Sequence, residues 1–301
     1  MDNSGLDYKP AGKCLVAFIS QESLRGVRRG HMSEKAKREI REKSSLLFRE
    51  EVDLDVFVFE EYFRELSKAG PAREMQPDFK LLRNHKYEEM NTFIKGLETE
   101  GYKYGSFVFV ITSYLPKYST SSSLAFELYD EDMTLDYFID TMKSFPSMAA
   151  KPKIFLVQAD NRALLVPEIF TKAGGFDEGP EPIGVKVPTD ADRLVIFSTI
   201  PQRLSTLPGD ATTDAGDVVS SPRSDPNASS FLMQALIEVL KMKSDTDLLC
   251  LTPSILGHME KLIEDFKKTH PSYNNRKIEL PLVMSTLTKR VILKKLAQQQ
   301  E

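Results

Sequence analysis

The sequence predicts an α/β fold in which helices cover both faces of a mostly parallel sheet. Strand-sized apolar runs alternate along the chain with segments of helical spacing, a pattern typical of parallel sheets. The run at residues 106–112 (SFVFVIT) is almost wholly apolar, β-branched and aromatic, as expected for a strand that is buried on both faces. Residues 153–158 (KIFLVQ) have the same character.

The other elements follow from the same two signals. Val56, Phe59, Phe63 and Leu66 recur at helical intervals, and Thr134 stands where the cap of a helix is expected. Strands are predicted at residues 13–20, 106–112, 124–128, 153–158, 193–198, 280–287 and 291–293. Helices are predicted at residues 33–48, 55–66, 87–97, 134–142, 230–241 and 254–268.

Two loops interrupt this pattern. Residues 163–190 are rich in glycine and proline and form the clearest linker, and residues 206–227 are rich in Gly, Asp, Ser and Pro. Residues 67–78 are also expected to form a loop. Loops as long as the first two usually indicate function or disorder in a compact domain.

Composition excludes several classes of function. The net charge of -4 argues against a protein that binds nucleic acid or a membrane surface, and no apolar run approaches the ~20 residues of a membrane span. No signal peptide is visible, so a cytoplasmic protein is expected. Cys14 and Cys250 lie in apolar segments and are predicted to be buried thiols. No carboxylate or histidine spacing indicates a metal site, and no cofactor is expected.

Six segments carry short motifs that occur in a fixed order along the chain. They are residues 49–55 (REEVDLD), 107–115 (FVFVITSYL), 151–162 (KPKIFLVQADNR), 191–201 (ADRLVIFSTIP), 230–236 (SFLMQAL) and 283–289 (VMSTLTK). Together they resemble the caspase catalytic domain: residues 151–162 resemble the family's strand K-P-K followed by Q-A-C-x-G, and residues 107–115 resemble the strand that ends in S-H-G.

The resemblance implies a three-layer αβα sandwich with a mostly parallel, six-stranded central sheet. It spans roughly residues 8–295, and because the segment before it is short, no death-fold prodomain is expected. Residues 1–162 would form a region like the large subunit, 163–190 the intersubunit linker and 191–301 a region like the small subunit, all within one domain.

The resemblance also implies a lost catalytic dyad. Tyr114 stands in place of the family's histidine and Asp160 in place of its cysteine, at close to the expected spacing of about 50 residues. Peptide hydrolysis of this kind needs a thiolate and an imidazole, whereas a phenol has a pKa of about 10 and is a poor base at neutral pH. Leu115 and Arg162 replace two glycines beside the oxyanion hole.

Part of the family's substrate pocket is retained. Arg49 and Gln158 match two groups of the clamp that holds an aspartate side chain, whereas Ser205-Thr206-Leu207 stands where the second arginine is expected. Arg203 could substitute only if its loop is shifted. Arg49 and Gln158 are interpreted either as polar framework groups or as remnants that still bind peptides.

Two features bear on partners. The strand that joins two small subunits in the family corresponds to Val283, Met284, Ser285, Thr286 and Leu287. Asp177 and Asp190 are candidate cleavage positions in the linker, although Asp190 is close to the next strand.

The first hypothesis is a pseudoenzyme that regulates an active caspase in apoptosis, with activation favoured over inhibition. It would form a heterodimer with an active paralogue, or a homodimer. The alternatives are a decoy that binds caspase substrates or inhibitors, an enzyme with altered chemistry, and a scaffold.

Overall fold

The computed structural model of the chain describes residues 6–8, 12–21, 54–68, 76–116, 124–161, 191–200, 229–269 and 280–298. The strands are β1 (Lys13–Ser20), β2 (Asp78–Arg83), β3 (Tyr104–Tyr114), β4 (Ala125–Glu127), β5 (Asp132–Thr134), β6 (Lys153–Asp160), β7 (Arg193–Ser198) and β8 (Leu282–Ser285). The helices are α3 (Leu54–Lys68), α4 (Tyr87–Glu100), α5 (Leu135–Lys143), α8 (Phe231–Met242), α9 (Leu248–Thr269) and α10 (Leu293–Gln298), with short 3₁₀ turns η4 (Gly101–Lys103) and η5 (Pro146–Met148).

Six strands form the central sheet in the order β2-β1-β3-β6-β7-β8. The first five are parallel, and β8 is antiparallel to β7 at one edge. Every residue of β3 and of β6 is buried. The predicted mostly parallel, six-stranded sheet is therefore confirmed, and β4 and β5 form a separate hairpin.

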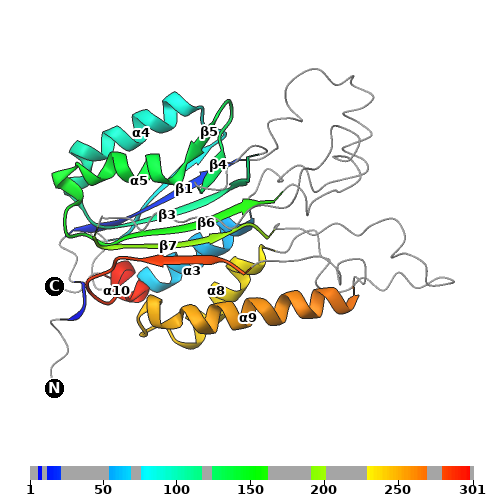
Figure 1. The fold of residues 1–301 in the computed structure, drawn as a ribbon. Coiled ribbons are helices and arrows are strands. Elements are labelled where there is room, and N and C mark those ends of the chain that lie inside the picture. The colour runs from blue at the N-terminus through cyan, green and yellow to red at the C-terminus, as the bar shows by residue number, and fades with distance from the viewer. Residues whose placement is uncertain are drawn as a thin grey trace, which may run out of the picture.

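Helices cover the sheet on both faces and complete three layers. Figure 1 shows α4 and α5 above the sheet and α3, α8, α9 and α10 below it. Alternate residues of β3 serve the two cores: Phe107, Phe109 and Ile111 pack against α4 and α5, whereas Val108 and Val110 pack on the other side. This alternation decides which side chains reach the site.

Two helix starts follow directly from the sequence. The Oγ1 atom of Thr134 accepts a hydrogen bond from the Tyr137 N–H at 3.1 Å, which confirms the predicted cap of α5. The Oγ atom of Ser230 accepts from the Met233 N–H at 3.2 Å at the start of α8. The Ser230 N–H in turn donates to Oδ1 of buried Asp55 at 2.6 Å, which ties α8 to the first turn of α3.

Three element predictions were wrong. Strand β2 was missed because its charged side chains obscure the pattern, although Phe79 stacks with Phe18 at a centroid distance of 6.2 Å. Residues 291–293 form no strand, because the Val291 backbone bonds Leu248 and Asp247 and α10 begins at Leu293. Helix α9 begins at Leu248 rather than at residue 254, and it includes Pro253.

The remaining predictions concern a membrane span and three segments that the structure does not describe. Within the described ranges, no helix is long and apolar enough to cross a bilayer. The helix expected at residues 33–48 and the loops at 163–190 and 206–227 lie outside those ranges.

Candidate functional site

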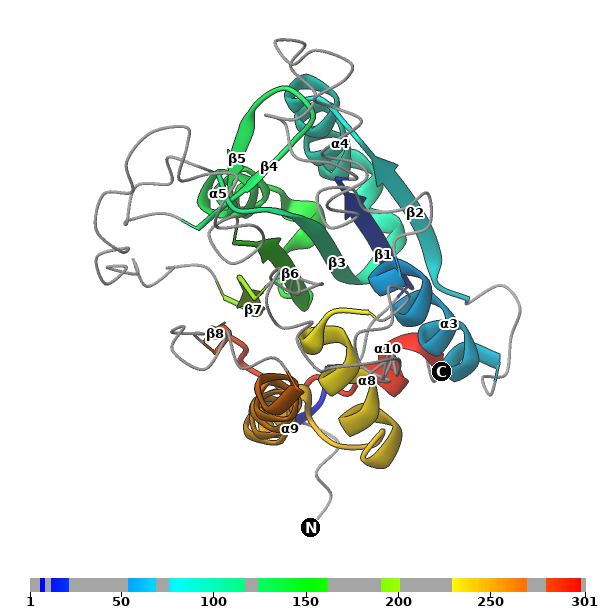
Figure 2. The ribbon, with the colours of Figure 1, turned by 90° about the vertical axis from the view of Figure 1, so that its right-hand side faces the viewer.

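A row of buried polar side chains crosses the sheet near the carboxyl ends of its strands. The strand register aligns Ser20 with Thr112, Thr112 with Gln158, and Gln158 with Ser198. Each of the four residues is at most 3% exposed. By the alternation of the strands they face the α3 and α8 layer. Ligands of open parallel sheets bind at this edge, onto which Figure 2 looks.

Tyr114 and Asp160 lie side by side, two residues beyond this row. They are cross-strand partners at the ends of β3 and β6, and both are buried. The Leu115 N–H donates to the Asp160 carbonyl oxygen at 3.0 Å and fixes the two strand ends relative to one another. The two positions that the sequence assigns to a degenerate dyad are therefore neighbours.

The side-chain amide of Gln158 connects Asp160 with the end of β7. Its Nε2 atom donates to Oδ1 of Asp160 at 2.7 Å and also to the carbonyl oxygen of Ile200. Both partners are acceptors, so the orientation of the amide is settled by chemistry. Within the described part of the chain, Oε1 of Gln158 is buried and accepts no hydrogen bond.

Neither cysteine lies at this edge. Cys14 is fully buried in β1, near its amino end, and burial raises the pKa of its thiol to about 12. Cys250 is exposed, so its predicted burial is wrong: it lies at the start of α9, where Leu248 and Leu251 take the buried positions. Its thiol donates to Oδ2 of Asp247 at 3.3 Å, and that carboxylate raises the pKa of the thiol.

The histidines that the structure describes have other contacts. Nε2 of His258 pairs with Glu238 of α8, and Nδ1 of His85 lies 3.2 Å from the carbonyl oxygen of Arg83. No group of three or more His, Cys, Asp or Glu side chains in the described ranges could hold a metal ion. Arg49, Ser205, Arg203, Asp177 and Asp190 lie outside those ranges, as do His31 and His270.

The predicted dimer strand is one of the two edge strands of the sheet in the described structure, the other being β2. Strand β8 pairs with β7 on one side, and no described strand lies on its other side. Val283, Met284 and Leu287 are half-buried and pack against the two cores, whereas Ser285 is exposed. Thr286 directs its N–H and C=O toward Arg193 and Asp192, so the adjacent Ser285 directs its own backbone groups outward.

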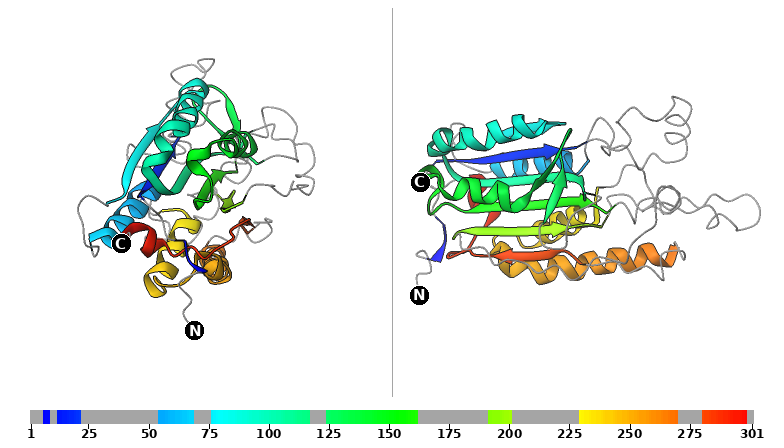
Figure 3. Two further views of the ribbon diagram at one scale, coloured as in Figure 1. Left: turned by 90° about the vertical axis from the view of Figure 1, so that its left-hand side faces the viewer. Right: turned by 45° about the horizontal axis from the view of Figure 1, so that its top comes forward.

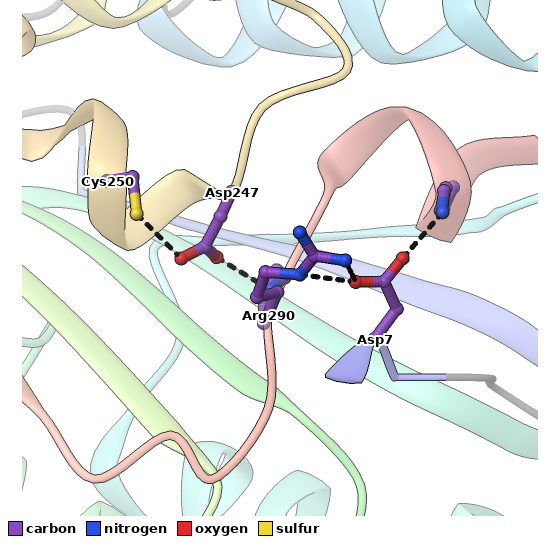
Figure 4. A network of polar contacts seen from close by, with 6 residues as sticks. Asp7, Asp247, Cys250 and Arg290 are labelled. Carbon is purple, nitrogen blue, oxygen red and sulfur yellow. Dashed lines mark hydrogen bonds and ion pairs between the residues drawn. The ribbon is translucent and has the colours of Figure 1, made fainter. Parts of the chain in front are cut away.

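A second polar cluster, which the sequence did not indicate, lies at the other end of the strands, near the amino ends of the parallel strands. Asp7 accepts hydrogen bonds from Arg290 Nε at 2.7 Å and from Lys295 Nζ at 2.6 Å (Figure 4). The left-hand view of Figure 3 looks onto this end of the strands. Tyr8 donates to the Asp192 carboxylate, which also accepts from Thr288 Oγ1 at 2.5 Å. We call the contacts of Asp7 and Tyr8 the N-terminal clasp.

The clasp is expected to stabilise the fold most at neutral pH. Its cations, led by the hydrogen bond from Lys295, hold the pKa of Asp7 below its ordinary value, so the stabilisation is present above pH ~4 and is lost as pH falls through the lowered pKa. Because Arg290 and Lys295 are half-exposed, Asp7→Asn should cost about 1–2 kcal/mol in the free energy of unfolding at pH 7.

Denaturant titrations at pH 7 and pH 3 check this expectation. Asp140→Asn is the matched control, because Asp140 pairs with Lys143 on an exposed face of α5 and its loss should change stability by less than about 0.5 kcal/mol. An Asp7→Asn penalty that stays constant down to pH 3 would contradict the assignment.

The clasp also bears on one of the two candidate cleavage positions, Asp190. A protease must unfold the residues on both sides of the bond that it cuts. Two residues beyond Asp190, Asp192 is 6% exposed, accepts hydrogen bonds from Tyr8 and Thr288, and bonds Thr286 and Lys153 through its backbone. Cleavage of the native protein by an active caspase should therefore not produce a fragment that begins at Ala191.

Mass spectrometry of the fragments tests this expectation. Tyr8→Phe removes only the hydroxyl that holds Asp192 and should increase cleavage after Asp190. A fragment beginning at Ala191 that forms from the native wild-type chain as fast as any other would show the expectation to be wrong.

Comparison with known proteins identifies the fold and then the family. The structure of pro-sf-caspase-1 superposes with a TM-score of 0.60 and 19% identity, over 96% of this chain and 92% of that one. Caspase-1 from Spodoptera frugiperda superposes with a TM-score of 0.59 and 17% identity, over 97% of each chain. The fold is thus that of a caspase-like α/β protein.

The sequence profile of the caspase domain, Peptidase C14, matches residues 47–292. The chain therefore belongs to the caspase domain family. A search of curated protein sequences found no match.

Proposed function

We propose that this protein is a non-catalytic member of the caspase family that regulates an active caspase by forming a heterodimer with it. The observation that carries the proposal is the pair of buried neighbours Tyr114 and Asp160 at the carboxyl edge of the sheet. A carboxylate bound to an amide is a weak nucleophile toward a peptide bond, and a phenol is a weak base at neutral pH.

Dimer formation is supported by the edge of the sheet. Strand β8 carries half-buried apolar side chains and outward backbone groups, and an edge of this kind pairs readily with another strand. The resemblance implies the same strand as the contact between small subunits. Such a contact could order the loops of the active caspase. The activity of that caspase would then change although this chain carries out no reaction itself.

The proposed sign of the effect is activation. In the heterodimer this chain would contribute strand β8 and no active site of its own. If the heterodimer forms more readily with an active caspase whose loops are ordered, binding shifts that caspase toward its active state. The proposed setting is apoptosis in the cytoplasm, and no cofactor is required.

Mixing the purified protein with active caspases tests the proposal. The readouts are co-elution in size-exclusion chromatography and hydrolysis of a fluorogenic aspartyl peptide at a fixed concentration of active enzyme. We expect co-elution with one paralogue and a rate that rises and saturates as this protein is added. Neither co-elution nor a change in rate with any caspase of the same cell would overturn the proposal.

A further inference from the structure

We infer that Asp160 closes the retained pocket from within, because its own carboxylate occupies the amide that would hold an acidic ligand. This inference concerns the site of the proposed function and rests on it. Asp160, which stands at the position of the lost nucleophile, would then also determine which ligands the site accepts.

The hydrogen-bond count of Gln158 is the first step. A side-chain amide has two N–H donors, and Gln158 uses them on Asp160 Oδ1 and on the Ile200 carbonyl oxygen. A carboxylate that enters from outside can only accept hydrogen bonds, so this amide has no donor left for it. To bind there, the ligand would have to displace the carboxylate of Asp160.

The other polar atoms of Gln158 and Asp160 also disfavour an anion. The free polar atom of Gln158 is Oε1, which is buried and is itself an acceptor. Asp160 is 3% exposed, and a second carboxylate beside it would bring two like charges together where screening by water is weak. The site should therefore reject peptides that end in aspartate even though Gln158 is retained.

The Asp160 bond also has a structural consequence. Through Gln158, the end of β6 is connected to Ile200, two residues beyond the end of β7. Asparagine at position 160 can keep this connection, because its Oδ1 atom accepts the same amide hydrogen without carrying a charge. Alanine cannot, and it leaves one donor of Gln158 available to a ligand.

Fluorescence anisotropy on the full chain tests the inference. The probes are two fluorescein-labelled tetrapeptide amides that differ only in ending in aspartate or in asparagine. Wild type should show no preference for the aspartyl peptide, whereas Asp160→Ala should prefer it by about tenfold or more, the effect of one charged hydrogen bond. Asp160→Asn, which keeps the bond to Gln158 and removes only the charge, should show a clearly smaller preference than Asp160→Ala.

Each outcome decides the inference. A folded Asp160→Ala without a preference overturns it, and so does Asp160→Asn with the same preference as Asp160→Ala, which would indicate charge alone. If Asp160→Ala does not fold, Asp160→Cys provides the same opening with a different side chain. Slow exchange of the Gln158 side-chain amide hydrogens, measured by NMR on wild type, is expected in any case, and fast exchange overturns the inference.

The experiment separates this inference from the proposed function. Asp160 belongs to β6 and not to β8, so both variants should co-elute with the active caspase as wild type does. If Asp160→Ala shows no preference for the aspartyl peptide but still co-elutes with the active caspase, only the inference is wrong. If Asp160→Ala shows the preference but neither it nor wild type co-elutes with any caspase, only the regulatory role is wrong.

Discussion

Purified protein is expected to hydrolyse an aspartyl peptide at least about 10⁴-fold more slowly than an active caspase under the same conditions. Removing the nucleophile or the base of a protease costs about 10⁶ in kcat, and the proposed function assigns neither group to this chain. Asp160 is in addition bound to Gln158, so its carboxylate is stabilised as an acceptor rather than activated. The measurement is a fluorogenic assay with material that is free of contaminating protease.

The double variant Asp160→Cys with Tyr114→His should recover no more than a small part of this loss. The two positions are neighbours, so a thiol and an imidazole could meet there. By the resemblance, Leu115 and Arg162 would still stand in place of two glycines beside the oxyanion hole, whose donors contribute about 10²–10³ in kcat. Turnover by wild type that persists in the presence of inhibitors of contaminating proteases would refute the non-catalytic assignment.

The sheet was predictable from the sequence because its central strands carry their signal locally. Strands buried on both faces, such as β3 and β6, must be apolar throughout, and a run of this kind is visible without a partner. Edge strand β2 has three charged residues among only six positions and no strict alternation, and its place depends on Phe18 and Phe63 from other elements. Such contacts cannot be read from the strand itself.

The residues of the candidate site were also predicted only in part from the sequence. Tyr114 and Asp160 were predicted because the strands that they end resemble motifs of the caspase family, and the strand register places them next to one another. Ser20, Thr112 and Ser198 were missed, although each of them ends or nearly ends a buried strand, a signal that could have indicated them. The bond between Gln158 and Asp160 joins two side chains of one strand, and only coordinates reveal that the amide is already used.

The exposure of Cys250 and the contacts of the N-terminal clasp could not be predicted from local sequence patterns. Cys250 lies in an apolar stretch, yet its position in the first turn of α9 places it on the outer side, next to Asp247. The clasp joins Asp7 with Arg290 and Lys295, almost the whole chain away. No local spacing signals an ion pair of this range, because the fold alone brings its members together.

Ser285→Pro is expected to weaken association with the partner caspase while leaving the chain folded. Thr286 uses its N–H and C=O on β7, so Ser285 directs its N–H outward, where a second strand would accept it. Proline removes that N–H and is tolerated on an edge strand when the missing donor faces away from the sheet. The dissociation constant of the heterodimer should rise by at least about tenfold, the loss of one well-placed hydrogen bond with the strand contact around it.

Ser285→Ala is the matched control because it removes the same side chain and keeps the backbone donor. Both variants lose the hydrogen bond from the Leu287 N–H to Ser285 Oγ at 3.2 Å, so a difference between them reports the backbone change made by proline, the lost outward N–H together with a fixed φ, and not the lost side chain. Ser285→Ala should bind as wild type does, and both should show circular dichroism spectra like that of wild type. If Ser285→Pro still co-elutes with the partner at wild-type affinity, the heterodimer does not form through β8, and its contact must be sought on another face.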